Sequence, residues 1–212
     1  MVFHVLNRGV GRRTLFEKDA DYLAFQRVVE ETLRTRPMRV CAYCLMPNHW
    51  HFILWPNNDG DLPRFMQQLT NTHVKRWKEH RHEIGQGHLY QGRYKCFPVE
   101  TDEYFYAAAR YVERNALRAG LVVSAEQWPW SSLALAAGPT DGFPILADWP
   151  LPRPANWGDI VNRPQSEAEL AALRKCVNRG CPWGDADWIA RTSRLLGIES
   201  TLRTRGRPKQ RS

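Results

Sequence analysis

The sequence predicts an α+β protein in which helices pack on a mostly antiparallel sheet, with a small helical extension towards the C-terminal end. Strand-like runs and helical apolar periodicities alternate through roughly the first half of the chain. Two of the strand-like runs are separated only by Met46-Pro47-Asn48, a tripeptide that suits a tight reversal. Strands joined this tightly run antiparallel, as a β-hairpin.

The chain opens with a strand and a helix. Val2 to Arg8 is a short run, rich in apolar residues, that ends at Gly9 and predicts the first strand. A helix begins at Asp19 or Asp21, repeats its apolar residues at three- and four-residue steps, and stops before Pro37.

The hairpin comes next, followed by a long basic helix, a strand and a further helix with Thr101 near its start as an N-cap signal. These elements are expected over residues 40–45, 49–55, 62–82, 94–99 and 101–117. The order strand, helix, strand, strand, helix, strand, helix is that of a ferredoxin-like core.

The composition changes after this core, which we expect within residues 1–137. Residues 138–165 are rich in proline and predict an irregular connection. Two short helical patterns, over 166–177 and 185–196, follow within an extension of residues 166–198 that is weakly similar to a helix-turn-helix. Residues 199–212 form a basic tail too polar to fold alone.

The charge balance points to a polyanionic partner. Thirty Lys and Arg against 22 Asp and Glu give a formal charge of +8 and a pI near 9.5. Nucleic acid is the first candidate. No apolar run approaches the roughly 20 residues needed to span a bilayer, and no secretory signal is visible. We therefore expect a cytoplasmic, nucleoid-associated protein without a membrane partner.

The five cysteines predict neither a disulfide framework nor a zinc site. Their number is odd, and the Cys41-Ala-Tyr-Cys44 spacing falls in a predicted strand. Residues three apart on a strand point to opposite faces, so these two thiols are not expected to share a metal. A structural role is the favoured interpretation.

His49-Trp50-His51 is the first candidate for chemistry. Two histidines at i and i+2 on a strand point to the same face, about 6 to 7 Å apart, and can hold one cation together. The motif alone is not specific, because such a pair is often incidental. Its place at the start of a strand, directly after the predicted turn, strengthens the metal interpretation.

Tyr111 and Asn115 are the second candidate, since they lie four residues apart on one face of the last core helix. If that face meets the sheet beside His49 and His51, Asn115 offers an oxygen ligand and Tyr111 a phenol. Two imidazoles, an amide oxygen and water suit Mg²⁺ or Mn²⁺. The simpler alternative is that Tyr111 is an amphipathic core residue.

Four ordered segments resemble the REP-associated tyrosine transposases, relatives of the single-tyrosine insertion-sequence transposases in the HUH endonuclease superfamily. The segments are His4-Val-Leu-Asn-Arg-Gly, Ala42-Tyr-Cys-Leu-Met-Pro-Asn-His-Trp-His-Phe-Ile-Leu, Tyr90-Gln-Gly-Arg-Tyr-Lys and Arg110-Tyr-Val-Glu-Arg-Asn-Ala-Leu-Arg-Ala-Gly-Leu-Val. The resemblance covers roughly residues 1 to 135. It departs from the family pattern at Trp50, where an aliphatic residue is common, and at Ala116, where many relatives have proline.

The resemblance implies an activity and a set of roles. His49 and His51 would be the paired histidines of the metal site, Asn115 the third ligand and Tyr111 the nucleophile. Members of this family cleave single-stranded DNA at hairpin-forming palindromic repeats and form a 5′-phosphotyrosine. Insertion-sequence relatives act as dimers, whereas the domesticated group need not, so a monomer and a homodimer both stay open.

Basic side chains supply candidate contacts to DNA phosphates. They are Arg12, Arg13, Lys75, Arg76, Lys78, Arg81, Arg93, Arg205 and Arg207. Arg205-Gly-Arg-Pro-Lys also resembles an AT-hook core, in which arginines enter a narrow minor groove. A solvated surface and a solubilising tail are equally compatible with these charges.

Two other functions are compatible with the same residues. One is a non-catalytic regulator that keeps the fold and binds the same hairpins. The other is a zinc hydrolase in which His49 and His51 activate water, which forms no covalent adduct. Dependence of cleavage on Tyr111 separates all three.

Overall fold

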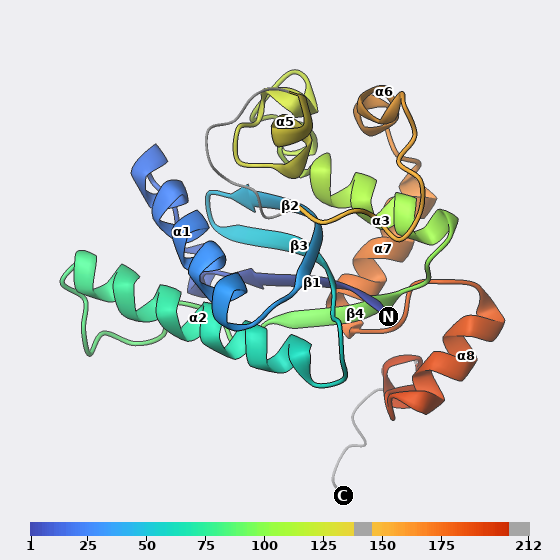
Figure 1. Ribbon diagram of the computed structural model, residues 1–212, viewed down its shortest axis with the longest axis horizontal. Coiled ribbons are helices and arrows are strands. Elements are labelled where there is room, and N and C mark those ends of the chain that lie inside the picture. Colours follow the sequence, from blue (N-terminus) through green and yellow to red (C-terminus); the bar gives the residue numbers. More distant parts are fainter. Residues whose placement is uncertain (138–145, 204–212) are drawn as a thin grey trace, which may run out of the picture.

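The structure is a computed structural model that describes residues 1–137 and 146–203 (Figure 1). Its centre is a four-stranded sheet in the order β2-β3-β1-β4, and each neighbouring pair is antiparallel. The strands are β1 (Val2–Arg8), β2 (Arg39–Met46), β3 (His49–Trp55) and β4 (Lys95–Val99). This arrangement confirms the predicted α+β, ferredoxin-like core.

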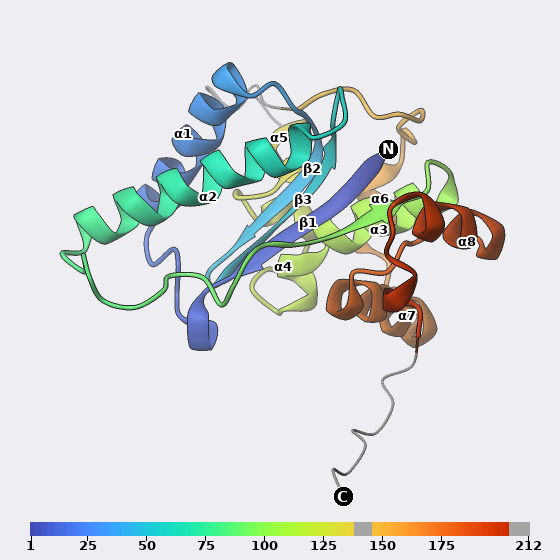
Figure 2. The same ribbon diagram turned by 90° about the horizontal axis from the view of Figure 1, so that it is seen from below.

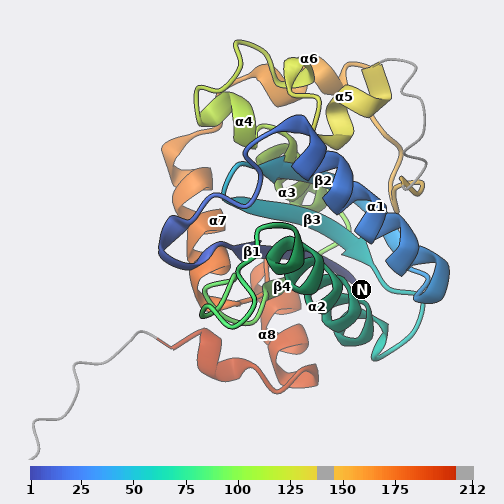
Figure 3. The same ribbon diagram turned by 90° about the vertical axis from the view of Figure 1, so that its left-hand side faces the viewer.

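Helices α1 (Asp19–Thr35) and α2 (Asp61–His80) cover one face of the sheet (Figures 2 and 3). Each turns its apolar side towards the strands, as their periodicities predict. Phe25 of α1 and Phe65 of α2 pack with Trp50 and Phe52 of β3 in one buried cluster. We call this side of the sheet the α1–α2 face.

Helices α3 (Glu103–Glu113) and α4 (Asn115–Arg118) lie on the opposite side, which we call the α3 face (Figure 2). A single helix to residue 117 was predicted, but Arg114 separates two segments. Its ψ of −1° departs from the helical value of about −42°. The side chain of Arg118 donates to the carbonyl oxygen of Tyr111 at 3.3 Å, next to this interruption.

The remaining helices are α5 (Ser132–Ala137), α6 (Trp157–Asn162), α7 (Glu167–Arg179) and α8 (Ala186–Leu195), with short 3-10 turns η1 (Val10–Arg12), η2 (Ala125–Gln127) and η3 (Glu199–Thr201). The two predicted helices of the extension are confirmed as α7 and α8. Helix α6 was not predicted; it is a six-residue element within the proline-rich connection, too short to show a periodicity.

Helix α7 packs against the core. Leu170 and Leu173 form a buried cluster with Tyr111 of α3. Gly180, at the end of α7, approaches β4 so closely that a Cβ atom at this position would lie 3.4 Å from the backbone oxygen of Cys96. Figure 2 shows α7 on the same side of the sheet as α3. The extension is therefore part of the α3 face.

The arrangement of the cysteines in β2 differs from the prediction. A β-bulge between Val40 and Ala42 shifts the register, so Cys41 and Cys44 both belong to the buried cluster of the α3 face. The expectation of opposite faces was wrong because it assumed an unbroken two-residue alternation. Both thiols are free and buried, which fits the structural role.

Within residues 1–137 and 146–203, no helix combines the length and the apolar character needed to cross a bilayer.

Candidate active site

His49 and His51 lie side by side on β3, as their spacing predicts. Their ring centroids are 5.1 Å apart and the planes are nearly perpendicular. In the sheet they pair with Arg8 and Leu6 of β1. His51 is buried, with 3% of its surface exposed, whereas His49 at the end of the strand is half-buried.

Tyr111 reaches the same place from α3. Its ring centroid lies 6.0 Å from that of His51 and 5.9 Å from that of His4, in edge-on contacts. Only 7% of the tyrosine is exposed, because Leu170 and Leu173 of α7 cover it. The structure therefore brings together the phenol and the imidazoles that the sequence analysis singled out.

Asn115 begins α4, four residues after Tyr111. Its side-chain oxygen accepts a hydrogen bond from Arg118 Nη2 at 3.0 Å. Its side-chain nitrogen is buried and has no hydrogen-bond partner among the described residues. An amide oxygen has two lone pairs, so the contact with Arg118 leaves one that can serve a metal.

His4 is a third histidine of this site, and the sequence analysis gave it no role. It is fully buried on β1, where its ring stacks on His51 at 5.0 Å and meets the edge of Phe97 at 4.8 Å. Its Nε2 lies 2.8 Å from Nδ1 of His51. The local pattern of β1 gave no sign of this contact, because it depends on the pairing of β1 with β3.

Two arginines surround these rings and were also missed as site residues. The guanidinium of Arg118 lies over the ring of Tyr111, 4.1 Å from its centroid. Arg8 pairs with His49 across the sheet, and its Nε is buried without a hydrogen-bond partner among the described residues. Arg118 therefore lies where it would attract an anionic group beside Tyr111, and Arg8 lies where it would attract one beside His49.

The histidines are neutral at neutral pH. Burial, followed by the charge of Arg118, lowers the pKa of His4 to about 3. Burial and the charges of Arg8 and Arg118 lower the pKa of His49 to about 4. Burial, then the neighbouring histidines and the same two arginines, holds the pKa of His51 well below its usual value. Neutral imidazole is the form that can bind a cation.

The donor set fits a hard divalent cation. Nδ1 of His49 lies 2.7 Å from the side-chain oxygen of Asn48, so Nδ1 carries the proton and Nε2 keeps its lone pair. Among the described residues, no group of three His, Cys, Asp or Glu side chains could hold a metal. A cation at His49 and His51 would therefore need oxygen from Asn115 and water, which suits Mg²⁺ or Mn²⁺.

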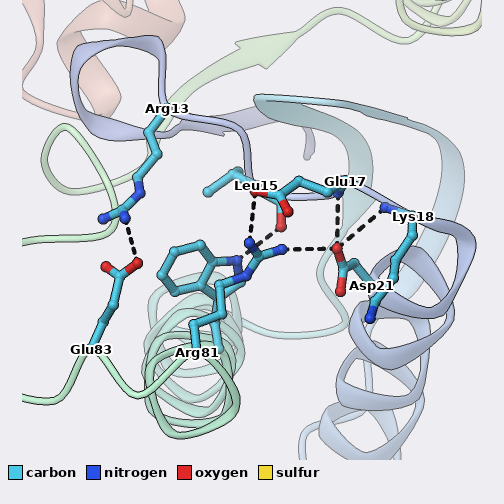
Figure 4. A network of polar contacts seen from close by, with 8 residues as sticks. Arg13, Leu15, Glu17, Lys18, Asp21, Arg81 and Glu83 are labelled. Atoms are coloured by element: carbon cyan, nitrogen blue, oxygen red, sulfur yellow. Dashed lines mark hydrogen bonds and ion pairs between the residues drawn. The ribbon is translucent and has the colours of Figure 1, made fainter.

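Four of the cations predicted to contact DNA are in ion pairs: Arg13 and Arg81, which Figure 4 shows, Arg76, and Lys75, whose Nζ lies 4.0 Å from Oε1 of Glu79. Arg13 contacts Glu83 at 2.5 Å, and Arg81 contacts Glu17 at 2.7 Å and Asp21 at 2.9 Å. Arg76 binds both oxygens of Glu31 through two parallel hydrogen bonds. The first two pairs connect the N-terminal segment and α1 to the end of α2.

Lys75 and the other predicted cations differ in their surroundings. Arg12 is exposed in η1. Lys75, Lys78 and Arg93 line one groove, and Lys78 donates to the backbone oxygen of Gly87. Arg205 and Arg207 lie outside the described residues.

The groove has a volume of about 1000 Å³ and lies between α2 and the segment 87–94. Besides the three predicted cations, its lining includes Arg64, Asn7, Asn71, Gln67 and the ring of Tyr94. Asn7 and His4 are three residues apart on β1, so their side chains point to opposite faces of the sheet. The groove therefore borders the α1–α2 face, and the histidine cluster lies on the α3 face.

The paired histidines and the tyrosine beside them lie together on the α3 face, and comparison with known proteins places this fold in a transposase family. A family model described as "Transposase IS200 like" matches residues 1–115. Because this match covers more than half of the chain, the protein belongs to the IS200-like transposase family.

The chain is also similar to individual known proteins. A protein of Haemophilus influenzae with the name "Putative REP-associated tyrosine transposase" is 23% identical over 122 residues, which are 53% of this chain and 69% of that protein. A solved structure of a REP-associated tyrosine transposase bound to a REP hairpin is similar with a TM-score of 0.53 and 18% identity, over 70% of this chain and 88% of the other. A structure described as a putative transposase from Deinococcus radiodurans has a TM-score of 0.41 and 15% identity, over 57% and 85%.

Proposed function

We propose that this protein is a metal-dependent endonuclease and strand transferase that cleaves and rejoins single-stranded DNA beside hairpin-forming repeats. The observation that carries the proposal is the position of Tyr111, whose ring lies 6.0 Å from His51 and directly under the guanidinium of Arg118. A phenol, paired imidazoles and two buried or half-buried arginines form the set needed to attack a phosphodiester.

His49, His51 and Asn115 would hold Mg²⁺ or Mn²⁺, for which the lone pair on Nε2 of His49 is available. When bound, such a cation polarises a phosphate oxygen and stabilises the charge of the transition state. Arg118 and Arg8 add positive charge near the imidazoles of His49 and His51. The guanidinium of Arg118 also lies over the ring of Tyr111, 4.1 Å from its centroid, in a cation–π contact.

The reaction exchanges one phosphate ester for another. The phenolic oxygen of Tyr111 forms a bond to phosphorus, and the bond from phosphorus to the 3′-oxygen breaks. The proton of the phenol is balanced by the proton that the departing 3′-oxygen takes up as a hydroxyl. The product is a 5′-phosphotyrosine, and attack by a 3′-hydroxyl reverses the step without an external energy source.

The groove beside α2 is the proposed path for part of the DNA. Lys75, Lys78 and Arg93 give it the charge for a phosphate backbone, and Tyr94 offers an aromatic surface for an unpaired base. The groove and the histidines lie on different faces of the sheet. The end of β1 and the start of β3 lie next to the segment 87–94, so a strand that passes this end of the sheet can reach both. The similar protein described as bound to a REP hairpin supports a hairpin with single-stranded flanks as the substrate.

The proposal is tested with end-labelled hairpin DNA that carries single-stranded flanks, incubated with the protein and Mg²⁺ or Mn²⁺. A covalent adduct that carries the 5′ end of the cleaved strand is expected from the wild-type protein and from a Tyr106→Phe variant. Tyr106 is the matched control, because it lies on the same helix and its hydroxyl donates to Pro152 instead. Tyr111→Phe is expected to form no adduct. If that variant does form an adduct, Tyr111 is not the nucleophile.

One observation favours a second candidate, a DNA-binding regulator without catalysis. Tyr111 is only 7% exposed and packs against Leu170 and Leu173, so DNA meets little of its surface unless α7 moves. A wild-type protein that binds the labelled hairpin, yet forms no adduct with either metal, would support the regulator.

A further inference from the structure

The hydrogen bond between His4 and His51 determines which nitrogen of His51 faces a cation. A neutral imidazole carries one proton and one lone pair on its two nitrogens. Nδ1 of His51 is occupied by Nε2 of His4, 2.8 Å away, so Nε2 is the only nitrogen of His51 left for a ligand. His51 can bind a metal only if its proton is on Nδ1.

Two arrangements of protons are compatible with this contact, and only one is competent for binding. In the first arrangement, Nε2 of His4 donates to Nδ1 of His51. The proton of His51 is then on Nε2 of His51, where it blocks the ligand position. If His51 donates from Nδ1, His4 accepts at Nε2 and carries its own proton on Nδ1. Both arrangements contain two protons on the pair, so the choice changes where the protons are and not how many there are.

The surroundings of His4 show why its side chain matters. Nδ1 of His4 is buried and has no hydrogen-bond partner among the described residues. In the competent arrangement this nitrogen carries an N–H in apolar surroundings, beside the ring of Phe97. A buried imidazole is costly here, and the polar contact that offsets part of this cost is the one with His51.

We propose that His4 is a positioning residue of the metal site, which accepts a hydrogen bond from Nδ1 of His51 and so directs the lone pair on Nε2 of His51 to the cation. Asn48 does the same for His49 through its side-chain oxygen. Metal-binding histidines commonly donate their second N–H to a carboxylate, a carbonyl or water. Here a second imidazole takes that place, and this inference rests on the proposed metal site.

The test is the affinity for Mn²⁺ alone, measured by electron paramagnetic resonance on the full chain. His4→Phe keeps the ring contacts and removes the acceptor, so the Kd for Mn²⁺ is expected to rise by about 10- to 100-fold. His4→Gln places an amide oxygen near the former Nε2 and is expected to recover most of the affinity. His73→Phe is the matched control, because His73 is also a buried, hydrogen-bonded histidine, on the α1–α2 face. The Kd of His73→Phe for Mn²⁺ is expected to equal that of the wild type.

A His4→Phe protein that binds Mn²⁺ with the wild-type Kd overturns the inference. If that same protein forms the Tyr111 adduct, the proposed function stands and only the role of His4 is overturned. A wild-type protein that binds no Mn²⁺ overturns both proposals.

A measurement on the wild-type chain covers the case in which His4→Phe does not fold. Long-range proton–nitrogen NMR correlations of the histidine rings, recorded with Mg²⁺, identify the protonated nitrogen of each ring. The expected result is a proton on Nδ1 of His51 and on Nδ1 of His4. A proton on Nε2 of His51 in the presence of Mg²⁺ contradicts the assignment.

Discussion

Two clusters of buried polar groups, one around Tyr90 on the α1–α2 face and one around His51 on the α3 face, differ in how their hydrogen bonds are completed. On the α1–α2 face, Tyr90 accepts a hydrogen bond from Trp50 at 2.9 Å and donates to His73 at 2.6 Å, and Trp77 donates to the backbone of Leu15. On the α3 face, His4 Nδ1, Arg8 Nε and Asn115 Nδ2 are buried without hydrogen-bond partners among the described residues.

We interpret the bonded groups as contributing to stability and the groups without partners as available for chemistry. Satisfied polar groups stabilise a unique packing, whereas a buried donor or acceptor without a partner costs about 1 to 3 kcal/mol. Groups kept in that condition beside two histidines and a tyrosine are available to a ligand. We therefore expect changes on the α3 face to reduce activity, and changes on the α1–α2 face to reduce stability.

The largest expected effect is that of Arg118→Met on the α3 face. Removal of the cation over Tyr111 is expected to slow formation of the covalent adduct by about 100- to 1000-fold, because a fixed positive charge near the reacting phosphate is lost. Single-turnover gel measurements on labelled hairpin DNA give the rate. Arg114→Met is the control, since Arg114 binds the backbone of Val161 and Asn162. Equal rates for the two variants would contradict this role.

On the α1–α2 face the expected loss is in stability. His73→Phe leaves the hydroxyl of Tyr90 without its acceptor and is expected to lower the free energy of unfolding by about 1 to 3 kcal/mol. Urea unfolding followed by circular dichroism measures the change. Adduct formation at a temperature where the variant is folded should match the wild type, and a variant that is stable but inactive would remove the distinction between the faces.

Acid is expected to destabilise the protein through both faces. Burial lowers the pKa of His73 to about 3, and that of His49 to about 4, from a usual value of 6.5. Below about pH 6.5 the unfolded chain takes up protons that the folded chain does not, so the free energy of unfolding falls as the pH falls, by up to about 1.4 kcal/mol per pH unit for each group. Urea unfolding at pH 7.5, 6 and 5 measures the slope. A smaller slope is expected for His73→Phe, and an unchanged slope would contradict the assignment.

The smallest expected effect concerns the groove. A Lys75→Ala, Arg93→Ala double variant is expected to bind single-stranded DNA more weakly and to reduce the slope of log affinity against log salt by about 1 to 2. Fluorescence anisotropy with a labelled oligonucleotide measures both. Arg76→Ala is the control because Arg76 is paired with Glu31, and it is expected to leave the slope unchanged. A double variant with the wild-type slope would exclude the groove as a phosphate path.

Local sequence patterns predicted most of the core. The hairpin, α1, α2 and the pairing of His49 with His51 follow from periodicity and turn chemistry, which act over a few residues. His4, Arg8 and Arg118 were missed because their roles depend on the register between β1 and β3 and on how α4 packs against the sheet. The bulge at Cys41 and the interruption at Arg114 are likewise set by contacts that no local pattern shows. The metal, the nucleophile and the target DNA stay predictions.

The hydrogen bonds of Glu113 decide where the protein can be truncated. This fully buried carboxylate, two residues after Tyr111, accepts hydrogen bonds from Ser132 at 2.6 Å and from Trp157 of α6 at 2.5 Å. A recombinant fragment that stops at residue 137 would leave one oxygen of this acid without its indole donor, and one that stops at residue 115, the end of the family match, would also lose Ser132. The minimal unit that keeps the helix of Tyr111 intact therefore extends through α6, and the shorter fragment is a poor choice for biochemical work.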